Sequence, residues 1–328
     1  MLAQALDDKQ HCVGIYHDGK LLYNCEEFDF GAVSATWNYN PVFAQNSTLI
    51  ASLFVGGKSL NEVCPDFLRH RWEAINARMR AFYKSFSTAK ISLERHCFYD
   101  LVPQRFLLEH CEMKNKITEH IIKTYDTPEN YDFMRKLAEF TYNIGQQKLN
   151  IDYAEIARES HHFKTRNFLK KSKHIKPYIS YNIYGTKTGR MTTYKGGFPI
   201  LTLDADYRSI LKPANNYFVE LDYNAAELRV LLGLSGKEQP QDDIHQWNID
   251  NIYRGIGTRE EAKKRIFAWL YNPKSKDYLS NRYYSRDEVT KKYFNGQQVT
   301  TFFDRTIESD KHHALNYLVQ STTSDLVL

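Results

Sequence analysis

The chain lacks the features that would place it in a membrane or an oxidising compartment. Its five cysteines form no Cys-x-x-Cys pair and lie near no histidine pair at zinc-finger spacing. This favours free thiols and a cytoplasmic location, in the host cytoplasm for a viral protein. No signal peptide is evident. The longest apolar run, near residues 48–55, is far too short to span a membrane and predicts a buried strand or short helix instead. The cysteines are Cys12, Cys25, Cys64, Cys97 and Cys111.

Acidic residues are missing from one long stretch. Residues 160–203 contain no Asp or Glu, although the net charge of the whole chain is only +5. The cations in this stretch are Lys164, Arg166, Lys170, Lys171, Lys173, Lys176, Lys187, Arg190 and Lys195. Such a segment repels itself unless a polyanion lies against it, and a nucleic acid backbone is the commonest such partner. A solvated basic loop is the alternative.

The hydrophobic pattern indicates a mixed N-terminal part followed by a mostly helical chain. Residues 1–60 are predicted to be strand-rich, with Asp18-Gly19 as the turn of a hairpin. From residue 61 to about 125 the pattern is helical and amphipathic. The chain shows no internal repeat and no low-complexity segment. The predicted fold class is α+β (mixed α/β).

Further along the chain, local signals predict where elements begin. Thr127-Pro128-Glu129 is typical of a helix start, and that helix is expected to end near Gly145. Another helix is expected to begin at residues 151–153. The apolar run at residues 217–221 has the length of a strand, and the chain after it is predicted to be mostly helical.

The first candidate chemical motif is at residues 217–230. The predicted strand delivers Asp222 at its end, and a helix follows that carries Glu227. A carboxylate at a strand end is a suitable ligand for Mg²⁺, which prefers hard oxygen donors. For Asp222 alone, an ordinary helix N-cap is the more frequent explanation.

The second motif is a predicted helix at residues 259–271. Arg259, Lys263, Phe267 and Tyr271 are spaced by four and therefore share one helical face. Two cations followed by two aromatic rings suit a nucleotide, with phosphates at one end and base and sugar at the other. An amphipathic helix whose aromatic rings enter the core is the alternative.

The third motif is the loop at residues 185–193. Its glycines allow close backbone approach, and Lys187, Thr188 and Arg190 offer phosphate and groove contacts. It lacks the spacing of a phosphate-binding loop and is unspecific when taken alone.

Together, the three motifs resemble family A (DNA polymerase I-like) DNA polymerases of the phage type. Thr188-Gly189-Arg190 matches the T-G-R loop of that family, and residues 222–229 match motif A, D-Y-S-x-x-E-L-R. The helix at residues 259–271 is similar to motif B, and Asp243-Ile244-His245 to the D-I-H between them. Residues 316–325 look like N-x-x-x-Q-G-T-A-A-D. The resemblance covers about residues 127–328.

The chain departs from the family pattern at several positions. Asn224 replaces the usual Ser of motif A. Ala268 and Asn272 replace the two glycines of motif B. Ser321 replaces a Gly, and His312 stands where many members carry Arg. These changes bear on tight packing and on one template contact.

The resemblance implies a right-hand fold. Residues 126–205 would form the thumb and a basic DNA-gripping segment, residues 206–230 the palm, and residues 231–328 the fingers and the start of the return to the palm. Residues 1–125 would form a small α/β domain in the position of the 3′–5′ exonuclease of relatives. Because that part has no D-x-E pair, no proofreading is expected.

The resemblance also implies roles for individual residues, with primer-template DNA and dNTPs as partners and Mg²⁺ as cofactor, two ions in the complete enzyme. The catalytic set is Asp222, Lys263 and Arg259, and the metal ligands are Asp222 and Tyr223. The nucleotide-binding set is Tyr223, Glu227, His245, Arg259, Lys263, Phe267 and Tyr271. The DNA-binding set is Lys170, Lys171, Lys173, Thr188, Arg190, Arg229, Asn316 and Gln320.

Alternatives to an active DNA polymerase remain open. The H-D-E motif of the family, with its second metal-binding Asp, would lie beyond Leu328, so we expect this chain alone not to extend primers. A non-catalytic DNA-binding protein, or one half of a split polymerase completed by a C-terminal segment or accessory proteins, is the main alternative. A related single-subunit RNA polymerase is disfavoured by Glu227, whose bulk excludes a 2′-hydroxyl. A nuclease is disfavoured because clustered carboxylates are lacking.

Overall fold

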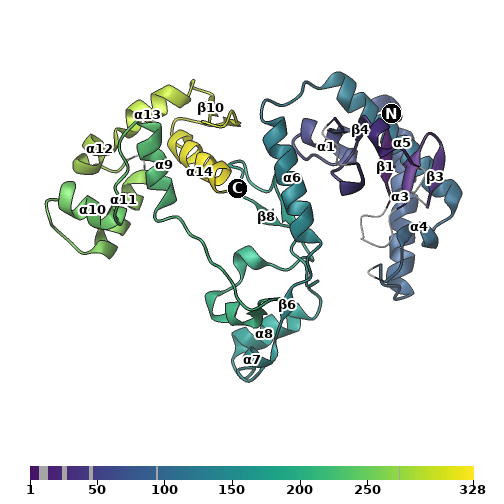
Figure 1. The fold of residues 1–328 in the computed structure, drawn as a ribbon, viewed down its shortest axis with the longest axis horizontal. Coiled ribbons are helices and arrows are strands. Elements are labelled where there is room, and N and C mark those ends of the chain that lie inside the picture. The colour runs from purple at the N-terminus through teal and green to yellow at the C-terminus, as the bar shows by residue number, and fades with distance from the viewer. Residues whose placement is uncertain (7–13, 24–27, 44–46, 94, 273) are drawn as a thin grey trace. The chain divides into compact units, whose positions relative to one another are not determined.

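The computed structural model describes residues 1–6, 14–23, 28–43, 47–93, 95–272 and 274–328. It is built of helices with short strands, as the mixed fold class predicted (Figure 1). The chain forms two compact units. The first consists of residues 1–149, 160–181 and 194–202, and the second of residues 150–159, 182–193 and 203–328. No helix in the described part of the chain is long and apolar enough to cross a membrane.

The first unit combines a small sheet with long helices. Its strands are β1 (Ala3–Ala5), β2 (Ile15–His17), β3 (Lys20–Leu22), β4 (Ala35–Thr36) and β5 (Leu49–Ile50). Its helices are α1 (Ala51–Phe54), α2 (Leu60–Val63), α3 (Asp66–Thr88), α4 (Phe98–Leu101), α5 (Gln104–Thr124), α6 (Tyr131–Gly145) and α8 (Phe163–Ser172). Short 3₁₀ turns lie at Phe30–Ala32, Pro41–Phe43 and Ile200–Thr202. The strand β7 (Tyr181–Asn182) lies where the chain passes to the second unit.

The predicted hairpin is confirmed in the first unit. Strands β1, β2 and β3 form an antiparallel sheet, and β4 pairs in parallel with β5. Asp18 and Gly19 both have positive φ, which a tight hairpin turn of two residues requires. Helix α5 packs against β1 and β4. Gln4 of β1, which is buried, donates to Asn115 and Thr118 of α5, so the polar group is satisfied inside the core.

Two predictions for this unit need correction. Helix α6 begins at Tyr131 with Asn130 as N-cap, because residues 128–131 form a turn in which the Tyr131 amide donates to the Pro128 carbonyl. Cys64 and Cys111 are free, but Cys97 is disulfide-bonded, contrary to the prediction of free thiols. Sequence spacing does not show which cysteines the fold brings together. Cys12 and Cys25 lie outside the described residues.

The second unit is mostly helical. Its helices are α7 (Ala154–Ala157), α9 (Ala226–Leu234), α10 (Ile244–Asn251), α11 (Arg259–Tyr271), α12 (Tyr278–Tyr284), α13 (Arg286–Tyr293) and α14 (Ala314–Val327). Its strands are β6 (Asn150–Ile151), β8 (Thr192–Thr193), β9 (Leu211–Lys212), β10 (Gln298–Thr300) and β11 (Thr306–Glu308), and a 3₁₀ helix spans Ala205–Ile210. A helix was expected to begin at residues 151–153. Instead, Ile151 ends strand β6, and the four-residue helix α7 begins at Ala154.

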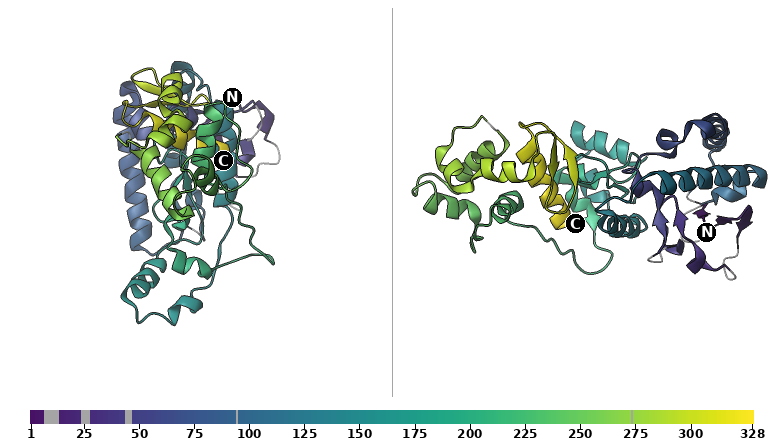
Figure 2. Two further views of the ribbon diagram at one scale, coloured as in Figure 1. Left: turned by 90° about the vertical axis from the view of Figure 1, so that its left-hand side faces the viewer. Right: turned by 90° about the horizontal axis from the view of Figure 1, so that it is seen from above.

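One core holds most of the second unit together. Helices α9, α10, α11, α13 and α14 contribute to it, and α14 contacts both α9 and α11. Leu228, Ile244, Ile266, Trp269 and Val319 are completely buried there. The green and yellow helices of Figures 1 and 2 form this group, with the β10–β11 hairpin beside α14. Four of these helices, α9, α10, α11 and α14, carry residues of the sequence motifs.

The predicted strand at residues 217–221 is wrong. The segment is extended but pairs with no other strand in the described part of the chain. Its side chains face solvent, with Tyr217 80% and Leu221 91% exposed. An apolar run becomes a strand only when a neighbouring strand accepts its backbone hydrogen bonds, and the described residues provide none here.

Candidate functional site

Helix α11 presents the two cations and two rings that the sequence placed on one face. Thr258 caps the helix, because its hydroxyl accepts from the Glu261 amide while Glu261 accepts from the Thr258 amide. Buried residues of α11 such as Ile266 and Trp269 fix which side faces the core. Arg259 and Lys263 remain exposed, whereas Phe267 and Tyr271 are partly buried. The predicted helix bounds are confirmed.

The two aromatic rings of α11 form a flat surface at the edge of the core. Phe267 and Tyr271 are stacked, with ring centroids 5.9 Å apart and planes 9° from parallel. His245 lies against Phe267, with ring centroids 5.8 Å apart. The alternative, that these rings enter the core, is confirmed in part. Both rings pack against the core, yet each keeps part of its surface exposed.

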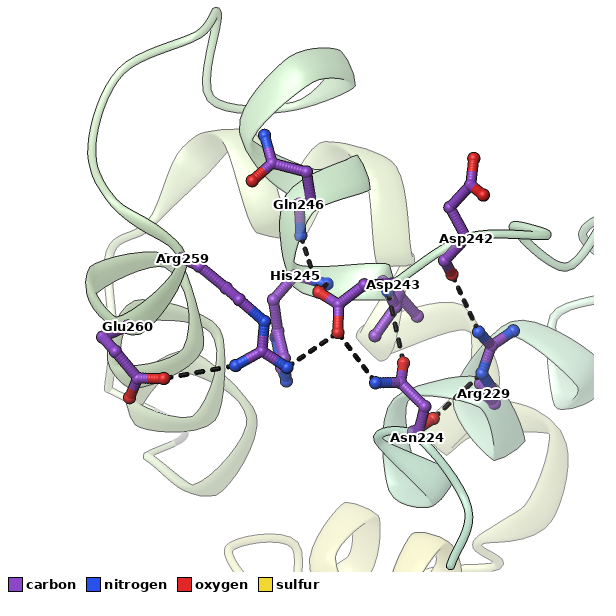
Figure 3. A network of polar contacts seen from close by, with 9 residues as sticks. Asn224, Arg229, Asp242, Asp243, His245, Gln246, Arg259 and Glu260 are labelled. Atoms are coloured by element: carbon purple, nitrogen blue, oxygen red, sulfur yellow. Dashed lines mark hydrogen bonds and ion pairs between the residues drawn. The ribbon is translucent and has the colours of Figure 1, made fainter.

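Asp243 is the centre of a polar network that joins the motifs (Figure 3). It caps α10, and its Oδ1 accepts from the amides of His245 and Gln246, both at 3.0 Å. Its Oδ2 accepts from Arg259 Nη2 at 2.7 Å and from Asn224 Nδ2 at 2.8 Å. The hydrogen bond from Arg259 holds the pKa of the Asp243 carboxyl well below its usual range. Asp243 is therefore ionised at physiological pH.

Arg229 fastens the turn before α9 to the segment before α10. Its guanidinium donates to three backbone carbonyls, those of Pro240 at 2.8 Å and, as Figure 3 shows, of Asn224 at 2.9 Å and Asp242 at 3.0 Å. Carbonyls at turns and helix ends need such donors when no backbone amide reaches them. The sequence assigned Arg229 to DNA only, so this bracing role was missed.

His245 is a buried histidine beside the exposed cations of α11. Only 3% of its surface is exposed, and its Nδ1 has no hydrogen-bond partner among the described residues. Burial lowers the pKa of His245, although the Asp243 carboxylate opposes this effect. The ring is therefore neutral near pH 7, so it can offer one N–H to a bound group but no positive charge.

The T-G-R loop reaches motif A through an ion pair. Arg190 donates to the Glu227 carboxylate in the first turn of α9. The Glu227 side chain is only 12% exposed, and burial raises its pKa while Arg190 lowers it. Two residues that the sequence assigned separately to DNA and to the sugar of the nucleotide thus lie together.

Gly189, like Gly185, occupies a position in this loop where a Cβ would clash with a neighbouring side chain. Its φ is +76°, and a Cβ there would lie 2.8 Å from Cζ of Arg305. Thr188 beside it is buried, and the Thr186 hydroxyl donates to the Arg190 carbonyl at 2.9 Å. The loop is therefore packed in place, and the Gly189 backbone lies close to Arg305.

Arg305 is held against this loop by Asp325 of α14. Its Nε and Nη2 donate to the two carboxylate oxygens at 3.0 and 2.7 Å. The side chains are 12% and 1% exposed, so the pair is buried. The sequence reasoning passed over this pair. A buried Asp in an apolar helix was the available signal, because such a residue requires a partner. On the same helix, Asn316 and Gln320 are partly buried.

The binding of Mg²⁺ by Asp222 and Tyr223 stays a prediction. Asp222 and Tyr223 lie on the exposed segment that forms no strand. Within the described ranges, no three His, Cys, Asp or Glu side chains are grouped so that they could hold a metal ion. Two cations at one centre need shared or adjacent carboxylates.

The predicted DNA-gripping lysines belong to the first unit. Lys170 and Lys171 lie in the last turn of α8, and Lys173 is its C-cap. All three are exposed, and no acidic side chain of the described residues pairs with them. Cations at a helix C-terminus are also favoured by the helix dipole, so their position alone does not require DNA.

No family model matches this chain, and no curated protein matches it at significant similarity. The functional assignment therefore depends on the motifs and on the contacts between them.

Proposed function

We propose that this chain binds primer-template DNA and selects dNTPs as part of a template-directed DNA polymerase with a right-hand arrangement of thumb, palm and fingers. The observation that carries the proposal is the convergence of the motifs in the second unit. Asp243 joins Asn224 of motif A to Arg259 of motif B, and Glu227 of motif A joins Arg190 of the T-G-R loop. These segments span residues 188–271, yet direct polar contacts connect them.

The chemistry of the exposed groups supports a nucleotide on α11. Arg259 and Lys263 supply positive charge at the N-terminal part of the helix, where phosphates are also favoured by the dipole. Phe267 and Tyr271 supply a flat apolar surface for sugar and base. His245 lies buried against Phe267, and its neutral ring has one N–H to donate to a phosphate oxygen. Catalysis in such a site would depend on positioning and electrostatics.

The remaining residues are proposed to contact DNA. Arg190, Arg229, Asn316 and Gln320 would face primer-template, the buried Thr188 would support the loop that carries Arg190, and Lys170, Lys171 and Lys173 would contact duplex phosphates. Arg190 is 52% exposed despite its ion pair, so its guanidinium can still bind a phosphate or a groove edge.

A second candidate is a non-catalytic DNA-binding protein or one half of a split polymerase. The observation that favours it is the exposure of Asp222 on a segment that forms no strand. Under this alternative DNA binding persists while nucleotide selection requires another polypeptide segment. Template-dependent binding of dNTPs by this chain alone, in the absence of any further polypeptide segment, separates the two candidates.

Replacing Lys263 with Ala is expected to weaken dNTP binding by roughly 1–3 kcal/mol, the usual scale for a lost charge-assisted hydrogen bond. Affinity for duplex DNA should change little. Equilibrium binding of a dNTP to the complex with a dideoxy-terminated primer-template measures the effect. Lys264→Ala is the matched control, because Lys264 is also exposed on α11 but lies outside the four-residue series. Equal losses from both variants would contradict the assigned face.

A further inference from the structure

We infer that the Asp243 carboxylate binds Arg259 in the nucleotide-free protein in place of a phosphate of the nucleotide. We also infer that Asn224 is the positioning residue that keeps Asp243 in place. This inference rests on the proposed function, because it concerns how the same triphosphate site is controlled. Asp243 would compete with the triphosphate for Arg259. Asn224, which replaces the usual Ser of motif A, would have the role of positioning Asp243.

The geometry of the carboxylate supports a preformed anion mimic. Four donors surround Asp243, two backbone amides on Oδ1 and the Asn224 and Arg259 side chains on Oδ2. A carboxylate offers about four acceptor positions, so each is used. Arg259 binds carboxylate and phosphate oxygens through the same planar set of N–H groups. An incoming phosphate must therefore displace Asp243 from Nη2 or share Arg259 with it.

Asn224 holds Asp243 from the opposite side of the network (Figure 3). Its Nδ2 donates to Asp243 at 2.8 Å, and its Oδ1 accepts from the Ile244 amide at 3.3 Å. Its own carbonyl accepts from Arg229 at 2.9 Å. When a phosphate takes Arg259, Asp243 keeps Asn224 and both amides of α10. The carboxylate thus stays in position to bind Arg259 again after the ligand leaves.

The contact can be tested without any nucleotide by labelling arginines with phenylglyoxal and mapping the sites by mass spectrometry. Asp243→Asn retains a good helix cap but removes the charge that holds Arg259. Labelling of Arg259 should rise about twofold to fivefold relative to Arg254, which is exposed in the same unit. Asp250→Asn removes one charge from the same helix and should leave the ratio unchanged. An unchanged ratio in Asp243→Asn would overturn the inference.

A double-mutant cycle tests the positioning role of Asn224. Asn224→Ala should raise Arg259 labelling, although less than Asp243→Asn does. In the Asp243→Asn background, Asn224→Ala should add little, because its effect passes through the Asp243 carboxylate. Asn224→Ser should restore part of the protection, since Ser retains one donor. Additive effects of the two substitutions would assign Asn224 to general packing and contradict its positioning role.

The competition itself is tested with inorganic triphosphate. Binding should be about twofold to fivefold tighter in Asp243→Asn than in the unchanged protein, the factor typical of removing an exposed ion pair. If Asp243 instead prepares Arg259 for the ligand, the variant will bind more weakly, and weaker, equal or undetectable binding rejects the competitor role. Failure of template-directed dNTP selection in the unchanged protein would reject the polymerase proposal, while the labelling and triphosphate results would still stand.

Discussion

Replacing Asp325 with Ala should lower the free energy of unfolding of the second unit by roughly 3–5 kcal/mol, the usual cost of removing one partner of a buried ion pair. Arg305 would lose two hydrogen bonds and the carboxylate that balances its charge, while remaining packed against Gly189. The T-G-R loop should loosen as a result. Hydrogen exchange of peptides from α9 and α14 in increasing urea measures the loss for this unit alone.

The control for this substitution is Asp287→Ala, which removes an exposed acid from the first turn of α13. Its cost should stay below about 1 kcal/mol. Trypsin should also cleave after Lys187 and Arg190 faster in Asp325→Ala than in the control. If both substitutions cost the same, the Arg305–Asp325 pair does not anchor the loop, and the packing assigned to Gly189 is wrong.

Replacing Lys170, Lys171 and Lys173 with Gln together should have the largest effect on DNA affinity. Each phosphate contact contributes about 0.9 to the slope of log affinity against log salt, so the slope should flatten by about 2 to 3. The loss of affinity should be greatest at low salt and should not depend on DNA sequence. Fluorescence anisotropy with a duplex at several salt concentrations measures the slope.

The control for the lysine substitutions is a second triple variant with the same change in net charge. Lys84, Lys136 and Lys148 are exposed and lie in the same compact unit as α8. Their replacement by Gln should change the slope far less. A slope that is unchanged after substitution of the α8 lysines would show that they only complement the helix dipole and are otherwise solvated.

Local patterns predicted the elements that local interactions determine. The hairpin at Asp18-Gly19 and the helix of residues 259–271 are examples, because turn chemistry and capping by Thr258 and Glu261 act within a few residues. The four-residue spacing likewise placed Arg259 and Lys263 on one exposed face.

What could not be predicted depends on contacts between distant residues. The apolar run at residues 217–221 has strand composition, but strand formation depends on a partner that no local pattern supplies. The network of Asn224, Asp243 and Arg259 joins residues at the starts of three different helices, α9, α10 and α11. The residues of the Arg305–Asp325 pair are 20 positions apart in the sequence. The disulfide at Cys97 is of the same kind, because pairing follows proximity in the fold and not sequence spacing.

The most direct test of the account is template dependence of nucleotide binding. The chain is mixed with a dideoxy-terminated primer-template, and binding of each of the four dNTPs is measured for every template base. The account predicts that the complementary dNTP binds in preference to the other three, and that Lys263→Ala abolishes most of this binding while the DNA remains bound. Equal binding of all four dNTPs, or no binding to the DNA complex, would contradict the proposal that this chain selects nucleotides.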